Sequence, residues 1–270
     1  ICASKKVKDM KRWNFALYTS LMFVLFSSPL HVFSQSKYVV TDVKGSMISI
    51  DSTFDVRPDK RALAIVRPYK SKITKLMTTQ IGVSSQTMED IDGYKEGLLS
   101  NLIADVLRKK GTEVSGKSCD MGLINKGGIR SILPKGKIMV SNIYEILPFE
   151  NTLCVLTLNG TQLKSLMEDI ARTRGQGVSG VKMVISKDGK LIDATVNNKP
   201  IDPNKSYLLA TINYLAEGND GLKTLARKDV QRVNYDNLTL RDIFMKYVKA
   251  QTALGKKISS SIDGRVKFVD

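Results

Sequence analysis

The sequence predicts an α+β protein: one mixed-sheet domain preceded by a helical segment. Stretches of apolar residues recur at helical spacing, whereas residues 181–213 alternate with period two in a β-rich composition. No internal repeat or low-complexity tract interrupts the chain. With 270 residues and 42% hydrophobic content, the protein can bury a substantial core.

The N-terminus has the pattern of a secretion signal. Lys11 and Arg12 form a positive region, residues 15–26 are apolar, and Pro29 ends the apolar run. This pattern predicts a signal peptide over residues 1–36. Its removal would leave a periplasmic or secreted protein with no transmembrane anchor. An uncleaved membrane anchor is the alternative.

The start of translation decides which residues belong to this signal. Met10 precedes the positive region and is a natural initiator, which would place residues 1–9 upstream of the true start. The exact cleavage site is left open.

Residues 37–80 form the next segment. Strand-like alternation occurs over 46–50, and Asp59 can cap a helix over 59–79 that Pro68 kinks or restarts. The polar residues 82–94 predict a loop.

The remaining elements follow from periodicity and turn residues. The apolar stripe over 96–110 predicts a helix that stops at Lys109-Lys110-Gly111. Asn159-Gly160 predicts a tight turn, and Thr239 with Asp242 begins a last helix. The other predicted elements are strands over 121–124, 152–158, 181–186, 191–196 and 206–213, one or two helical turns over 141–147, and a helix over 161–172.

Charge and cysteine content bound the possible partners. The formal charge is +16, which favours anionic ligands, although a solubilising basic surface would also explain it. No arginine-rich tract or aromatic-basic interleaving is present, so a nucleic-acid partner is not expected. Cys119 and Cys154 could form a disulfide or remain as buried free thiols.

The sequence contains few side chains that could act in catalysis. The only histidine is His31, within the predicted leader, which excludes a Ser-His-Asp or Cys-His nucleophile in the mature chain. A dimetal phosphoesterase centre normally uses several histidines with carboxylates, and no close acidic cluster is present. We therefore predict no catalytic residues and no metal or cofactor on this chain.

Three short motifs, the first and third of them rich in glycine, offer groups that suit a flat, anionic ligand. They are Asn125-Lys126-Gly127-Gly128-Ile129-Arg130, then residues 147–152 (LPFENT), then residues 213–221 (NYLAEGNDG). Gly127 and Gly128 permit close approach of a ligand, and Arg130 offers a planar cationic fork. Taken singly, each motif could equally be a turn, a core aromatic or a solvated loop.

In this order and spacing, the three motifs resemble those of the C-terminal, substrate-binding domain of the 5'-nucleotidase family. The resemblance covers about residues 80–270, with a domain over 81–270, and the helix at 59–79 resembles the connector that precedes this domain. It also includes residues 96–105 (EGLLSNLIAD), 153–167, 178–180 (VSG) and 263–265 (DGR).

The resemblance implies a role for each residue of the site. Phe149 and Tyr214 would sandwich the nucleobase, and Asp220 would bind the ribose. Asn125 and Arg130 would contact the polar end of the substrate. The remaining implied ligand-binding residues are Asn151 at the base edge and Gly127 and Gly128 in the first loop.

The sequence departs from the family pattern in two places. Lys126 replaces a glycine, and Gly93-Tyr94-Lys95 stands where further arginines are usual, so the phosphate contact is altered. The family's N-terminal metallophosphoesterase motifs, of the types DxH, GDxxD and GNHE, are absent. The family is classed with the phosphohydrolases, but this sequence carries none of the dimetal ligands.

The resemblance thus predicts the nucleotide-binding half of a split periplasmic 5'-nucleotidase. A separately encoded metallophosphoesterase would carry the divalent metals. The alternatives are a stand-alone nucleoside-binding envelope protein and a basic nucleic-acid- or envelope-binding protein. Whether the substrate is a monophosphate, a cyclic nucleotide or a nucleotide sugar stays open, as does the stability of any complex.

Overall fold

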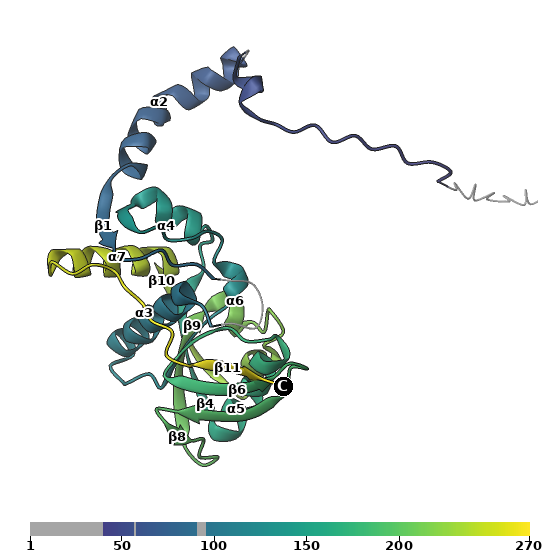
Figure 1. The fold of residues 1–270 in the computed structure, drawn as a ribbon, viewed down its shortest axis with the longest axis vertical. Coiled ribbons are helices and arrows are strands. Elements are labelled where there is room, and N and C mark those ends of the chain that lie inside the picture. Colours follow the sequence, from purple (N-terminus) through teal and green to yellow (C-terminus); the bar gives the residue numbers. More distant parts are fainter. Residues whose placement is uncertain (1–39, 57, 91–95) are drawn as a thin grey trace, which may run out of the picture. The chain divides into compact units, whose positions relative to one another are not determined.

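The fold is described from a computed structural model over residues 40–56, 58–90 and 96–270 (Figure 1). The chain divides into two units, residues 1–58 and 59–270. In the first unit the described residues are irregular apart from the 3-10 turn η1 (Ser52–Val56), so the strand predicted over 46–50 is wrong. The predicted signal peptide and Gly93-Tyr94-Lys95 lie outside the described residues.

The second unit begins with helix α2 (Lys60–Met77). The Asp59 carboxylate caps it, accepting hydrogen bonds from the backbone N–H groups of Arg61 and Ala62 at 2.7 and 2.9 Å. The helix continues through Pro68, so it does not restart there. None of its residues is buried.

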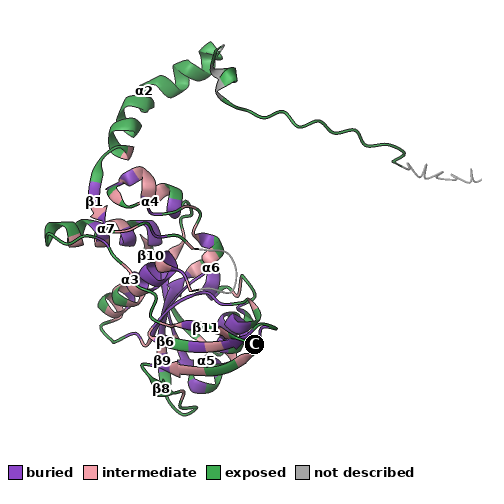
Figure 2. Cartoon of the chain, in the orientation of Figure 1, coloured by how far each residue is buried: buried purple, intermediate pink, exposed green. Residues whose placement is uncertain are grey.

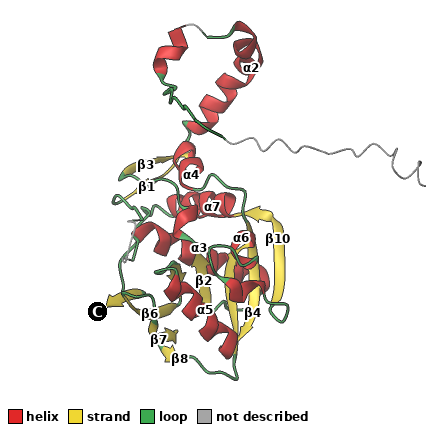
Figure 3. Ribbon diagram, turned by 90° about the vertical axis from the view of Figure 1, so that its right-hand side faces the viewer, coloured by secondary structure: helices red, strands yellow, loops and turns green. Residues whose placement is uncertain are grey.

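The α+β prediction is confirmed, and the largest sheet is mixed (Figure 3). It has five strands, with β2 and β9 parallel and the other neighbours antiparallel. In spatial order the strands are β10 (Gln231–Thr239), β4 (Thr152–Asn159), β9 (Ser206–Ile212), β2 (Met121–Ile124) and β5 (Gly177–Ser179).

Two smaller sheets complete the β-structure of the described residues. The four-stranded sheet pairs β11 parallel to β6, and β1 pairs antiparallel with β3 in the two-stranded sheet. Their bounds are β11 (Val266–Val269), β6 (Val181–Ser186), β7 (Leu191–Val196), β8 (Lys199–Pro200), β1 (Gln80–Ser84) and β3 (Gly136–Met139).

Helices pack on the five-stranded sheet and bury its side chains. Helix α3 packs against β2, β5 and β9, α5 packs against β4 and β9, and α7 packs against α3 and β10. The helical elements after α2 are α3 (Leu98–Ser115), η2 (Lys126–Gly128), α4 (Val140–Ile146), α5 (Gly160–Arg172), α6 (Asn213–Ala216), η3 (Lys223–Ala226) and α7 (Leu240–Ala253).

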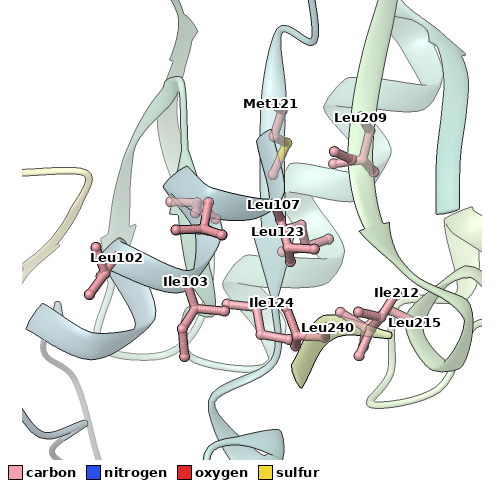
Figure 4. Packing of buried hydrophobic residues seen from close by; sticks show 14 of the residues in the cluster. Leu102, Ile103, Leu107, Met121, Leu123, Ile124, Leu209, Ile212, Leu215 and Leu240 are labelled. Atoms are coloured by element: carbon pink, nitrogen blue, oxygen red, sulfur yellow. The ribbon is translucent and has the colours of Figure 1, made fainter. Parts of the chain in front are cut away.

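The core lies between α3 and the central strands. Figure 2 shows the central strands largely as buried, and Figure 4 shows Ile103 and Leu107 beside Leu123 and Ile124 of β2. The approach is closest at Gly122, where a Cβ would lie 2.2 Å from the carbonyl oxygen of Ala104. This contact fixes the strand that leads into the first glycine motif.

Several predicted boundaries are wrong for physical reasons. Helix α3 does not stop at Gly111, because this glycine is buried against Ala210 of β9, and the helix ends instead at Gly116 in the left-handed region (φ +66). Asn159 caps α5 instead of forming a turn, accepting a hydrogen bond from the N–H of Gln162 at 2.8 Å. The predicted loop over 82–94 begins with strand residues, since β1 gains its hydrogen bonds from β3.

Cys119 and Cys154 are free and buried, so the disulfide alternative is wrong. Burial raises the pKa of the Cys154 thiol to about 11, and this thiol donates to the Asn234 side-chain oxygen at 3.0 Å. Burial also raises the pKa of Cys119. Both thiols therefore stay protonated and unreactive near neutral pH.

Candidate functional site

One pocket of about 430 Å³ brings the three motifs together. Loops that follow β2, precede β4 and follow β9 supply its lining. The volume falls within the usual range for small-molecule sites. The lining is the complete set of predicted site residues: Asn125, Gly127, Gly128, Arg130, Phe149, Asn151, Tyr214 and Asp220.

The first motif turns sharply at the end of β2. Asn125 is extended, and the Gly128 N–H donates to the Asn125 carbonyl oxygen at 3.1 Å to close the turn. A Cβ on Gly128 would lie 2.7 Å from the Asn125 side-chain oxygen, so only glycine fits beside this amide. Arg130 is exposed, and its guanidinium donates to the Gly127 carbonyl oxygen at 3.0 Å.

Asp220 links the first and third motifs. Its carboxylate accepts hydrogen bonds from the Asn125 amide at 2.6 Å and from the Tyr214 hydroxyl at 2.8 Å. Its backbone is in the left-handed region (φ +52), which Asp tolerates better than most residues. The Asn219 amide closes the loop by donating to the Tyr214 carbonyl oxygen at 2.9 Å. The carboxylate is therefore held in place and still has lone pairs for a ligand.

The two aromatic side chains of the site are accessible. Phe149 is 49% exposed and Tyr214 is 37% exposed, whereas Phe244 in the core is fully buried. The alternative that Phe149 is a core residue closing a turn is therefore wrong. Accessible rings at a pocket can stack on a planar ligand.

Arg241 holds the second motif, a role that no sequence pattern indicated. Its guanidinium donates to the carbonyl oxygen of Pro148 at 3.2 Å, pairs with the Glu150 carboxylate at 3.2 Å, and lies 4.3 Å above the Tyr144 ring. Arg241 is nearly buried, at the start of α7. An arginine so far along the chain from the loop cannot be matched to it by local pattern.

Two further supporting residues were not predicted. The Gln176 side-chain oxygen accepts a hydrogen bond from the Lys126 N–H at 3.0 Å. The Asn213 side-chain oxygen accepts from the N–H groups of Thr152 and Tyr214, at 3.1 and 2.9 Å, and so joins the second and third motifs. Asn213 lies inside the third motif, so the sequence could have suggested it.

We expect Tyr214 to ionise at an unusually high pH. Its hydrogen bond to Asp220 raises the pKa of the phenol above its ordinary value of 10.0. The bond is intact below pH 10 and is lost as the pH rises through the raised pKa. Ultraviolet difference titration against Tyr214→Phe should show this pKa, and Asp220→Asn should lower it. An unchanged pKa in Asp220→Asn would contradict the assignment.

The site can bind a ligand, and its described residues provide few groups for bond cleavage. It offers one carboxylate, two carboxamides, one guanidinium and two rings. In the described ranges, no three His, Cys, Asp or Glu side chains are placed to hold a metal ion.

Among the residues that the structure describes, no helix combines the length and apolarity needed to cross a bilayer.

Comparison with known proteins identifies relatives. The model of the 5'-nucleotidase C-terminal domain family matches residues 73–227, more than half of the chain. The trifunctional nucleotide phosphoesterase protein YfkN of Bacillus subtilis (strain 168) is 27% identical over 263 residues, covering 88% of this chain and 17% of that protein. Protein UshA of Escherichia coli (strain K12) is 23% identical over 196 residues, covering 71% of this chain and 35% of UshA.

A solved structure agrees with these matches. The 5'-nucleotidase precursor from Thermus thermophilus superposes with a TM-score of 0.67 at 26% identity, covering 78% of this chain and 43% of that one. The chain thus spans less than half the length of each of these three proteins. It is the domain match that assigns the family: this chain belongs to the family of the 5'-nucleotidase C-terminal domain.

Proposed function

We propose that this chain binds the base and ribose of a nucleotide and presents its phosphate to a separately encoded metallophosphatase. The observation that carries the proposal is the single pocket lined by all eight motif residues. The named relatives, a nucleotide phosphoesterase and a 5'-nucleotidase precursor, point to the same class of ligand.

Each group in the pocket has a part in this proposal. Phe149 and Tyr214 stack on the base, and Asn151 contacts its edge. Asp220 accepts hydrogen bonds from ribose hydroxyls, in the position that Asn125 and Tyr214 give it. Arg130 lies at the polar end. Fixing the nucleoside in this way would hold the phosphate at the partner's metal centre, and such positioning can contribute strongly to the rate.

Catalysis on this proposal belongs to the partner. The divalent metals and the attacking water would come from the metallophosphatase, and this chain would hydrolyse nothing alone. Both proteins would work in the periplasm or outside the cell, to which the predicted signal peptide over residues 1–36 would direct this chain.

Calorimetric titration with AMP and with adenosine tests the proposal. Binding of both, together with AMP hydrolysis only after addition of a metallophosphatase from the same genome, is the expected result. Metal-dependent phosphatase activity of the purified chain alone would overturn the split-enzyme proposal. Tight adenosine binding with no stimulation by any such phosphatase would favour a stand-alone nucleoside-binding protein.

The salt dependence of binding affinity distinguishes nucleoside binding from the remaining alternative, a basic nucleic-acid- or envelope-binding protein. A basic nucleic-acid-binding protein should lose affinity steeply with salt and ignore the aromatic residues. Nucleoside binding should depend on Phe149 and Tyr214 and change little with salt.

Gly128→Ala should weaken adenosine binding through Asn125. The added methyl group displaces the Asn125 amide from Asp220. A hydrogen bond to a charged group is worth about 1.5–3 kcal/mol, and this energy sets the upper limit of the affinity loss at roughly 10- to 150-fold.

A double-mutant cycle with Asn125→Ala checks this route. If the methyl group acts through the amide, the double variant loses no more affinity than the weaker-binding single variant. Additive losses would show that Gly128 contacts the ligand by another route.

A further inference from the structure

Helix α2 is amphipathic, and its apolar side is exposed apart from contacts with α4 and the packing of Met77 against the core. Figure 2 shows the helix exposed along most of its length, and none of its residues is buried. Its large apolar side chains are 46–69% exposed, which is unusual for so many neighbours on one helix. They are Leu63, Ile65, Val66, Tyr69, Ile73 and Leu76.

Helical geometry gathers these residues, except Leu63, on one side. Each residue turns the helix by about 100°, and on the helical wheel one uninterrupted group of apolar positions spans an arc of about 120°. In order around the helix they are Ile65, Leu76, Tyr69, Ala62, Ile73, Val66 and Met77.

All charged residues of α2 are basic. The helix contains six and no Asp or Glu. On the wheel Lys72 and Lys70 border the apolar arc on its two sides, and the rest occupy the opposite face. The other four are Lys60, Arg61, Arg67 and Lys75.

We infer that α2 docks on an anionic lipid surface. An apolar arc bordered by lysines suits the interface between headgroups and acyl chains, where the arc enters and the long side chains reach the headgroups. A second copy of this chain fits less well, because pairing the arcs would bring together two sets of like charges. The charges call for an acidic partner, and their distribution on both sides of the arc favours a continuous surface. This inference is independent of the nucleotide site.

Fluorescence from labels on opposite sides of α2 tests which side meets the lipid. In the full chain with Cys2→Ser, an NBD label is placed at Ile73→Cys or at Ser71→Cys, since Cys119 and Cys154 are buried. Vesicles of phosphatidylglycerol and phosphatidylcholine should shift the Ile73 label to the blue and leave the Ser71 label unchanged. Pure phosphatidylcholine should produce a much smaller shift.

The two labels lie on opposite sides of the same helix, so a difference between their shifts reports on α2 and not on membrane binding by another segment. A leader that merely tethers the protein would leave both labels in water, and equal shifts would indicate non-specific adsorption. Either outcome overturns the inference. A blue shift of the Ile73 label without vesicles that grows with protein concentration would also overturn it, in favour of self-association.

Charge removal provides the second measurement. The triple variant Lys70→Gln, Lys72→Gln, Lys75→Gln should bind the vesicles roughly 100-fold more weakly, because each basic residue near an anionic surface adds to the attraction. Lipid affinity is measured from the concentration dependence of the shift of the Ile73 label. The matched control removes three exposed lysines from the strands: Lys182→Gln, Lys199→Gln and Lys267→Gln. The control should bind as the wild type does, and an equal loss would show that net charge alone is responsible and would overturn the inference.

Discussion

Replacing both aromatic residues of the pocket, Phe149→Ala with Tyr214→Ala, should strongly weaken adenosine binding. Stacking on one aromatic ring is worth about 1–3 kcal/mol per base, so two rings on one base contribute roughly 2–6 kcal/mol. This corresponds to a loss of about 30-fold to more than about 10,000-fold in affinity. Isothermal titration calorimetry with adenosine measures it.

Single variants identify the source of the loss. Phe149→Ala should leave the melting temperature nearly unchanged, because this ring is already 49% exposed. Tyr214→Phe keeps the ring and removes only the hydrogen bond to Asp220, so it should lose less affinity than Tyr214→Ala. If the double variant bound adenosine as tightly as the wild type, the base would not lie between these rings.

A large loss of stability is expected for Gly122→Ala in β2. The new methyl group would lie 2.2 Å from the Ala104 carbonyl oxygen and 2.9 Å from the Arg108 Cβ, so α3 must move away from the strand. Overpacking of this kind typically costs about 1–3 kcal/mol. For a domain of this size that corresponds to a fall of about 2–12 °C in melting temperature.

Gly127→Ala is the matched control for stability. No atom lies within 4 Å of a Cβ built on Gly127, and the residue is exposed. Calorimetric melting should therefore change by less than about 0.5 kcal/mol in free energy of unfolding. Equal melting temperatures for Gly122→Ala and the wild type would mean that α3 can move away from β2 at little cost.

Much of this fold could be predicted from local sequence patterns, because short buried strands and helix caps depend on residues that are close together in the chain. The strand over 121–124 and the cap at Thr239, whose hydroxyl accepts from the Asp242 N–H at 3.1 Å, are confirmed. The end of α3 was missed because it depends on Gly111 packing against Ala210, a contact between residues far apart in sequence. Strand β10, an edge strand with mostly exposed side chains, lacks the apolar alternation that would have revealed it.

The candidate site shows the same division. Its lining could be named from three short motifs, because each motif carries its own polar or aromatic groups within a few residues. The residues that hold those motifs in place could not, since Arg241 and Gln176 come from other parts of the chain. Whether the eight lining residues bind a nucleotide stays a prediction.

The link between Asn125, Asp220 and Tyr214 has a kinetic consequence. These hydrogen bonds are made between protein groups alone, and the left-handed turn at Asp220 holds the loop that carries them. A ligand then has no loop to order before it enters, which removes one common source of slow association. Nucleosides that differ in base or sugar should therefore associate at similar rates and differ mainly in how long they remain bound.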